Sequence, residues 1–389
     1  MIMAGYKQQH NIWPLLFLLL TAGLSACGSS QTGKQTPSNT PFADQPRNVI
    51  LMIGDGMGLT QISAALYANN NRLFLEEFPI VGLHKQHSSN NLITDSAAGA
   101  TAFACGVKTY NDAIGVDKDT LPVTNLIEIC RKKGMSTGIV VSSSLAHATP
   151  AAFYAHQRSR VMKEEIALDL MTNRVDFLVG GGLADFNERS IDNRNLIDEM
   201  RTYGYQISTF LEDELPRTLI NTRQPFVYFT ARNEPLSSMM GRDYLPIAAR
   251  LATAYLDNRA ANKGFFLMVE GSQIDWAGHA KRGPYLISEA LDFNETIGEV
   301  LRFAKRNRET LVIVTADHET GGTAIQPDSK LKNINLAFTG NAHTASMVPV
   351  FAFGPGAEAF AGIYENTDIN RKIKAALSLD TIKVGVVQQ

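Results

Sequence analysis

Nearly continuous apolar runs recur along the chain and predict its secondary structure. The four clearest runs span 48–53, 138–141, 265–269 and 311–314. Runs of this kind are typical of strands that are buried on both faces of a sheet. Helical patterns separate them, for example at 126–133, 161–171, 247–259 and 287–305. The alternation predicts an α/β fold: a three-layer sandwich with a large, mostly parallel central sheet flanked by helices.

Polar groups suited to metal binding follow each of these runs. They are Asp55 after the first run, His147 and Thr149 after the second, Glu270 after the third, and Asp317 with His318 after the fourth. In open sheets of this class, ligands bind beyond the carboxyl ends of the strands. The pattern therefore predicts a metal site at that edge.

Further candidate ligands lie near the last two runs. Asp275 and His279 are four residues apart, so on a helical turn they share one face and can bind one cation. The adjacent Asp317 and His318 can reach one metal only if the strand has ended, which the glycines after them indicate. His343 is a lone candidate before another apolar run.

The donor types separate two kinds of site. Mixed histidine and aspartate ligation suits zinc, whereas oxygen-only ligation suits magnesium. The residues that can supply oxygen alone are Asp55, Thr149 and Glu270.

Asp95 and Ser96 precede a run of small residues, which predicts a helix that begins at Ser96. Taken alone, this pattern is that of an ordinary helix cap. The free N–H groups at a helix N-terminus also favour negative charge, such as that of an alkoxide or a phosphoryl group. Beside a metal site, Ser96 therefore becomes a candidate nucleophile.

The composition and the N-terminal sequence limit which binding partners and which cellular location the chain can have. The chain has 389 residues, 44% of them hydrophobic, and a net charge of −2. The sequence has no cluster of basic residues, so it does not predict a nucleic-acid partner. A charged start, a short apolar run and small residues predict a lipoprotein signal peptide at 1–26, with lipidation at Cys27. An ordinary signal cleaved elsewhere is the alternative.

The domain boundaries follow from this N-terminus. Residues 27–45 are expected to form a flexible tether, and 46–389 one catalytic domain. The protein is thus expected to be exported, to the periplasm or the cell surface, and to contact the membrane only through its lipid. The stretch 205–245 is expected to form a lid or a surface insertion. Cys105 and Cys130 are expected to be two buried thiols, with a bridge as the alternative.

Taken together, the chain resembles the bacterial alkaline phosphatases. The matching stretches recur in family order from about residue 47 to 355, and their order and joint spacing are more specific than any one of them. They are 53–58, 94–98, 106–109, 148–152, 269–271, 274–279, 315–318 and 343–344.

The resemblance implies two zinc ions and one magnesium ion. It assigns Asp275, His279 and His343 to the first zinc, Asp317 and His318 to the second, Asp55 as a bridge from the second zinc to magnesium, and Thr149 and Glu270 to magnesium. It also implies hydrolysis of phosphate monoesters through a phosphoserine at Ser96. Arg160 would clamp the phosphate, and a homodimer is the family expectation.

Two positions depart from the best-known enterobacterial pattern. His147 stands where that pattern has an acidic residue, and Trp276 where it has a lysine. Both lie at the substrate side of the implied site. We expect His147 to weaken the retention of magnesium and Trp276 to weaken the binding of the product phosphate. Asp95 is expected to orient Arg160 through an ion pair.

Other functions are possible for this fold superfamily, namely sulfatases, phosphodiesterases and metal-dependent mutases. A sulfatase needs a convertible Cys or Ser with nearby Pro and Arg, which the sequence around Ser96 lacks. Related diesterases usually have threonine as the nucleophile, and mutases do not normally carry an export signal. A phosphate- or metal-capturing lipoprotein without turnover is the alternative outside the enzymes, but the catalytic set is complete.

Overall fold

The computed structural model describes residues 41–379, which fall in one compact unit. The predicted signal peptide, the lipidation site Cys27 and residues 27–40 of the predicted tether lie outside the described residues. At the start of the described part, the ring of Phe42 packs against Phe353 with centroids 5.5 Å apart. The Arg308 guanidinium lies 3.8 Å from the centre of the Phe42 ring. No helix within residues 41–379 is both long and apolar enough to cross a membrane.

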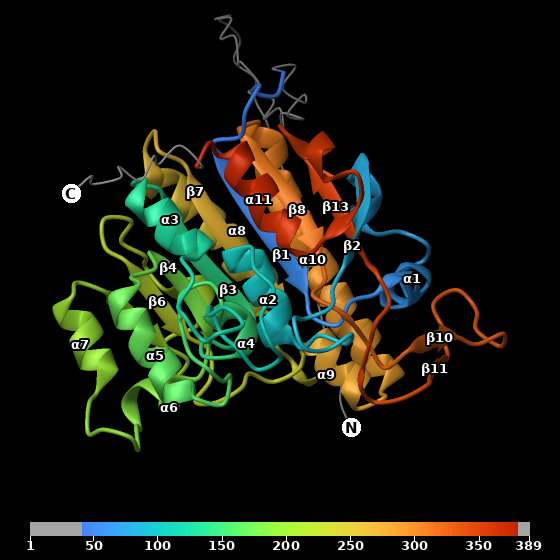
Figure 1. Cartoon of the computed structure of the whole chain (residues 1–389), viewed down its shortest axis with the longest axis horizontal. Helices are drawn as coiled ribbons and strands as arrows, with labels where there is room; N and C mark the ends of the chain where they lie inside the picture. Colours follow the sequence, from blue (N-terminus) through green and yellow to red (C-terminus); the bar gives the residue numbers. More distant parts are fainter. Residues whose placement is uncertain (1–40, 380–389) are drawn as a thin grey trace, which may run out of the picture. The chain divides into compact units, whose positions relative to one another are not determined.

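The centre of the molecule is a ten-stranded sheet. In spatial order its strands are β14 (Gly362–Glu365), β2 (Ile80–Lys85), β13 (Val348–Phe353), β8 (Thr310–Thr315), β1 (Asn48–Gly54), β7 (Phe265–Gly271), β3 (Ser136–Ser144), β4 (Phe177–Gly181), β6 (Phe226–Phe229) and β5 (Gln206–Thr209). Of these strands, only β13 runs antiparallel to its neighbours. The four predicted apolar runs are adjacent in space as β8, β1, β7 and β3 (Figure 1).

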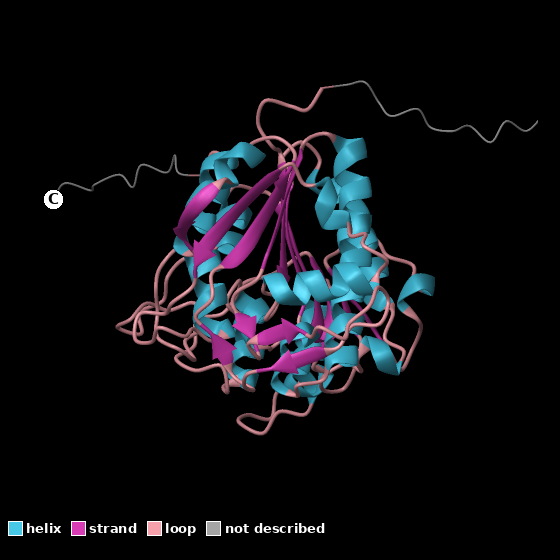
Figure 2. Cartoon of the chain, turned by 90° about the vertical axis from the view of Figure 1, so that its right-hand side faces the viewer, coloured by secondary structure: helices cyan, strands magenta, loops and turns pink. Residues whose placement is uncertain are grey.

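Helices cover both faces of the sheet, as Figure 2 shows. One core contains side chains of α2 (Ser96–Cys105), α3 (Leu126–Lys132), α4 (Ala148–Ala151), α5 (Lys163–Thr172), α6 (Leu183–Asn187), α7 (Leu196–Thr202) and α11 (Thr367–Ala376). The other contains side chains of α1 (Leu59–Ala68), α8 (Tyr244–Ala260), α9 (Gln273–His279) and α10 (Gly283–Asn307). Strand β1 joins the two cores because Val49 and Leu51 enter one, while Ile50 and Met52 enter the other. The predicted three-layer α/β fold is confirmed.

Short elements complete the fold around this sandwich. Two small antiparallel sheets pair β9 (Glu319–Thr320) with β12 (His343–Thr344), and β10 (Thr323–Ile325) with β11 (Leu336–Phe338). The 3₁₀ helices are η1 (Phe74–Glu77), η2 (Leu215–Arg217), η3 (Ser238–Met240) and η4 (Ala357–Phe360).

The stretch 205–245 is only partly the surface insertion that its sequence suggested. Its first half supplies β5 and β6, which extend the central sheet at one edge. Its second half is a loop that contains η3 and leads into α8. The two strands have four residues each, too short for a clear periodic pattern.

The two cysteines of the described part are buried free thiols, as predicted. Cys105 ends α2 and Cys130 lies in α3. Burial raises the pKa of the Cys130 thiol to about 12, so at neutral pH it stays protonated and unreactive.

Candidate active site and metal centre

The predicted ligands gather where the central strands end. Asp55 directly follows β1, Glu270 is the second-last residue of β7, and Asp317 comes two residues after β8. Their strands are neighbours in the sheet, so their carboxyl ends lie at one edge. All three side chains are fully buried there.

A first group of ligand atoms is formed by Asp275, His279 and His343. Asp275 and His279 lie one turn apart on α9, and His279 Nε2 is 3.2 Å from Asp275 Oδ2. His343 Nε2 lies 3.1 Å from His279 Nε2 and 3.5 Å from Asp275 Oδ1. Three donor atoms that converge in this way are suited to one cation with nitrogen and oxygen ligands.

A second group surrounds His318. Its Nε2 lies 3.2 Å from Asp317 Oδ2 and 3.5 Å from Asp55 Oδ1. Asp317 reaches the imidazole next to it because β8 ends at Thr315, as the glycines after His318 indicated, and Asp55 reaches it from the end of the neighbouring strand β1. Asp275 also comes within 4.8 Å of ligand atoms of Asp55 and His318, so the first and second groups adjoin.

A third group unites Asp55, His147 and Glu270, whose ligand atoms lie within 4.8 Å of one another. Thr149, the predicted magnesium ligand, is buried in α4 two residues after His147. The geometry thus places an imidazole beside a site that the sequence predicted to be oxygen-only.

Unpaired buried oxygens test whether these groups fit metal ions. Both carboxylate oxygens of Asp55, one each of Glu270 and Asp317, and the Thr149 hydroxyl are buried without a hydrogen-bond partner. Burial of such groups without a partner costs several kcal/mol, so they are rare unless a cation or water compensates. The donor atoms present therefore fit bound cations.

The pKa values also show that the charges of the buried carboxylates are not compensated within the protein. Burial raises the pKa of Glu270 to about 8 and, together with Asp275, that of Asp317 to about 6. Burial and the neighbouring carboxylates also raise the pKa of Asp55 well above its ordinary value. Contact with Asp275 raises the pKa of His279 to about 9. A bound cation would favour the deprotonated form of all four groups.

Ser96 faces the second group from the start of α2. Asp95 caps this helix, since its side chain accepts a hydrogen bond of 2.9 Å from the Ala98 amide. Ser96 Oγ lies 3.3 Å from His318 Nε2. The hydroxyl therefore lies between a helix N-terminus and the candidate ligands, as predicted.

Arg160 lies on the same side of the site. Its Nη1 donates to Asp95 Oδ2 at 3.2 Å, which confirms the expected ion pair. Its Nη2 is 3.5 Å from His147 Nε2. The His147 ring in turn lies edge-on to Trp276, with centroids 5.7 Å apart. The predicted substrate-binding residues thus form one chain of contacts.

Comparison with known proteins decides the family. The family model described as alkaline phosphatase matches residues 46–336. The chain belongs to the alkaline phosphatase family. It is 33% identical to alkaline phosphatase 4 of Bacillus subtilis (strain 168), over 90% of this chain and 93% of that protein. Membership makes the chain a metal-dependent hydrolase of phosphate monoesters.

Solved alkaline phosphatases share its fold. The enzyme from the Antarctic bacterium TAB5 is 41% identical, with a TM-score of 0.80 over 86% of this chain and 98% of that one. A TAB5 mutant with one histidine changed to aspartate has magnesium bound in its M3 site. That structure is 40% identical, with a TM-score of 0.79 over 86% of this chain and 99% of its own.

The sequence did not reveal every residue that holds this alkaline phosphatase site. Thr320 Oγ1 donates to Asp275 Oδ1 at 2.5 Å and lies 3.2 Å from His318 Nδ1, so it connects the first two groups. Glu319 accepts hydrogen bonds from Gln61 and Thr344 and fixes the segment that carries His343. The only signal was their position directly after His318. Such outer contacts orient metal ligands.

Proposed function

We propose that the chain hydrolyses phosphate monoesters to an alcohol and inorganic phosphate through a phosphoserine on Ser96, with two zinc ions and one magnesium ion. The observation that carries this proposal is the position of Ser96 Oγ, at a helix N-terminus and 3.3 Å from His318 in a cluster of buried, unpaired oxygens. Such a cluster balances its charge by binding cations.

The three groups supply the ligands. We assign Asp275, His279 and His343 to one zinc, and Asp317 with His318 to the other. Asp55, Thr149 and Glu270 would hold magnesium, and Asp55 would also be a ligand for the second zinc. When bound, these ions supply Lewis acidity that stabilises the attacking and leaving oxygens.

The residues of the chain perform the remaining work. Ser96 Oγ gives up its proton to solvent and attacks phosphorus, so the Oγ–P bond forms while the bond between phosphorus and the alcohol oxygen breaks, and that oxygen takes up a proton from solvent. The Arg160 guanidinium, held by Asp95, binds two phosphoryl oxygens in a fork and balances their charge. The α2 N-terminus adds N–H donors on the same side. Water then attacks the phosphoserine, releases phosphate and restores the Ser96 hydroxyl.

His147 modifies the third site. Its imidazole takes a place beside Asp55 and Glu270 without adding negative charge. The TAB5 mutant, in which a histidine-to-aspartate change accompanies bound magnesium, supports a role for such a position in magnesium retention. We propose that this chain holds magnesium weakly. Export, lipid attachment at Cys27 and a homodimer stay predictions from the sequence.

The test is hydrolysis of a chromogenic phosphomonoester by the purified full chain, with added zinc and magnesium, across pH and with EDTA. Ser96→Ala should lower kcat by about a thousandfold or more, as losses of catalytic nucleophiles do. Ser63→Ala, which changes a partly exposed serine on α1, is the control. Acid quenching should trap phosphate on the wild-type chain but not on Ser96→Ala. Full activity in Ser96→Ala, or faster hydrolysis of a phosphodiester or sulfate ester, would overturn the proposal.

A further inference from the structure

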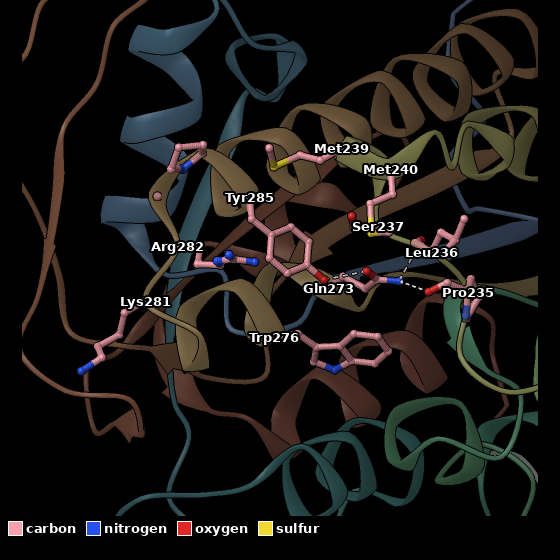
Figure 3. A pocket seen from close by; sticks show the side chains of 12 residues that line it. Pro235, Leu236, Ser237, Met239, Met240, Gln273, Trp276, Lys281, Arg282 and Tyr285 are labelled. Carbon is pink, nitrogen blue, oxygen red and sulfur yellow. Dashed lines mark hydrogen bonds between the residues drawn. The ribbon is translucent and has the colours of Figure 1, made fainter.

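A cavity of about 700 Å³ adjoins the active site on the outer side of α9 (Figure 3). Its walls come from the loop around η3, from α9 and from the start of α10. The residues that matter for its chemistry are Leu236, Met239, Met240, Trp276, Arg282 and Tyr285. A cavity of this size is typical of small-molecule sites.

The cavity connects to the phosphate-binding side through Trp276. This residue lines the cavity and also contacts the His147 ring, and His147 contacts Arg160. Trp276 directly follows Asp275, a candidate ligand, so the two side chains leave α9 about 100° apart. Trp276 thus lies between the cavity and the residues that contact Arg160, and a molecule with its phosphate at Arg160 would have to pass Trp276 to reach the cavity.

The lining is apolar and adaptable at the surface. Leu236, Met239 and Met240 are 58%, 57% and 67% exposed, although they are large apolar residues. Apolar residues gathered in this way mark binding surfaces. Methionine side chains adjust their shape and make favourable contacts with aromatic rings. With Trp276 and Tyr285, they offer a site for a flat apolar group.

The walls are held in place before any ligand binds. Gln273 Nε2 donates to the carbonyls of Pro235 and Leu236 at 3.1 and 3.2 Å, and its Oε1 accepts from the Tyr285 hydroxyl at 2.7 Å. Arg242, just after η3, forms buried ion pairs with Glu289 and Asp292 of α10. Preorganised walls lower the entropic cost of binding.

Arg282 and Lys281 both line the cavity, but only one of these two cations points into it. Figure 3 shows the Arg282 side chain pointing toward Tyr285 and the middle of the cavity, whereas Lys281 points away from it. Within residues 41–379, neither side chain has an ion pair or side-chain hydrogen bond. Arg282 is thus available to bind an anionic group of a ligand.

We propose that this cavity binds the alcohol part of the substrate. It would favour phosphate monoesters whose alcohol carries a flat aromatic group, and Arg282 would add a preference for a negative charge on that ring. The inference rests on the proposed function, because it takes the phosphate to bind at Arg160. It assigns to residues 235–240 and 282–285 the selection of the leaving group, with no part in the chemistry.

The test uses the metal-loaded full chain, three phosphate esters and their phosphonate analogues. Ethyl phosphate and nitrophenylethyl phosphate are both alkyl esters, so the ring changes the contacts and not the reactivity of the leaving group. A third ester carries a carboxylate on the ring. The corresponding phosphonates, which are not hydrolysed, give Kd values by calorimetry and by quenching of Trp276, the one tryptophan of residues 46–389.

The wild type should prefer the aromatic ester to ethyl phosphate by about tenfold or more in kcat/KM and in phosphonate Kd, as burial of a ring's apolar surface implies. Met239→Gln with Met240→Gln should reduce this ratio at least about threefold. Arg282→Gln should abolish the further gain from the ring carboxylate. Lys281→Gln, which removes an equal charge that points away from the cavity, should leave both ratios unchanged.

The remaining outcomes separate the cavity assignment from the proposed phosphatase function. Equal Kd values for the two phosphonates would overturn the cavity assignment and leave phosphatase function intact. A preference unaffected by the methionine and Arg282 variants would also overturn it, since the ring would then bind elsewhere. Absence of hydrolysis for every ester would overturn the proposed function, and the phosphonate Kd values would still decide the cavity.

Discussion

The two sides of α9 differ in how their polar groups are satisfied. On the inner side, Asp275 and His279 belong to a cluster with four buried carboxylates, several of whose oxygens have no partner. On the outer side, Gln273 and the Arg242 network, which consists of Arg242 with Glu289 and Asp292, have their hydrogen bonds completed within the protein. The inner side therefore needs bound ions to complete its polar contacts, whereas Gln273, Arg242 and the partners of Arg242 on the outer side are satisfied within the protein. Removing ions should affect only the inner side, and breaking the Arg242 ion pairs should affect only the outer side.

Metal removal should have the largest effect. EDTA should abolish activity and lower the Tm. The difference in Tm between the metal-loaded and the metal-free protein should increase as pH rises. The pKa of Glu270 is raised from 4.5 to about 8 by burial, so the stability it contributes to the metal-free fold is present below pH 4.5 and lost by about pH 8. Calorimetry of metal-free and metal-loaded protein at several pH values measures this. A Tm difference that shrinks toward pH 8 would contradict the account.

Arg242→Met should be the most destabilising substitution on the outer side. It leaves Glu289 and Asp292 buried without their cation, which typically costs about 3–5 kcal/mol of unfolding free energy. The metal content should stay unchanged. Denaturant unfolding and metal analysis check both points. Arg232→Met, which breaks an exposed pair with Glu188, is the control and should cost below about 1 kcal/mol. Loss of metal from Arg242→Met would show that the two sides are coupled.

Asp95→Ala and Asp95→Asn separate the two roles of this residue on the inner side. Both remove the charge that holds Arg160, so both should raise the phosphate inhibition constant, by about tenfold for a loss near 1.4 kcal/mol. Only alanine removes the cap of α2, at about 1 kcal/mol of stability. Inhibition assays and thermal unfolding measure the two effects. Normal phosphate affinity in Asp95→Ala would rule out the positioning role.

His147→Asp should lower the magnesium concentration needed for full activity by several-fold, because a carboxylate adds charge beside Asp55 and Glu270. His147→Asn, which is similar in size but neutral, should not. Magnesium titration of activity at constant zinc decides between them. An unchanged magnesium dependence in His147→Asp would mean that this position does not limit retention.

Trp276 lies between the two sides and should give the smallest effect. Trp276→Lys places a cation near the phosphate and should lower the phosphate inhibition constant a few-fold, as one partly exposed charge does. Trp276→Leu should leave that constant unchanged. Inhibition by phosphate at constant pH distinguishes the two variants. If lysine fails to tighten phosphate binding, Trp276 serves the cavity alone.

The inner side could be predicted from the sequence because its residues follow strands. A run such as 48–53 predicts a buried strand, and topology then brings Asp55 to the same edge as Glu270 and Asp317. The pairing of Asp275 with His279 followed from helical spacing alone. The resemblance placed His147 near magnesium, but its position among the ligand atoms of the third group could not be predicted, because it depends on how the turn before α4 orients the side chain.

The outer side could not be predicted in the same way. Its walls come from two segments, 235–240 and 273–285, whose apolar residues have no regular spacing. Only the fold shows that Gln273 and Arg242 bring these segments together. The strands β5 and β6 were missed for a related reason, since they depend on pairing, of β6 with β4 and of β5 with β6, rather than on a periodic pattern of their own.

The buried Arg242 network also has a consequence for enzyme engineering. It anchors the loop at its C-terminal end, while Gln273 holds the backbone carbonyls at its start, so neither anchor depends on the side chains at 236, 239 or 240. Those three positions can be randomised as a library with the anchors kept. Variants selected from such a library would differ in substrate range and would share the same catalytic residues and metal ligands.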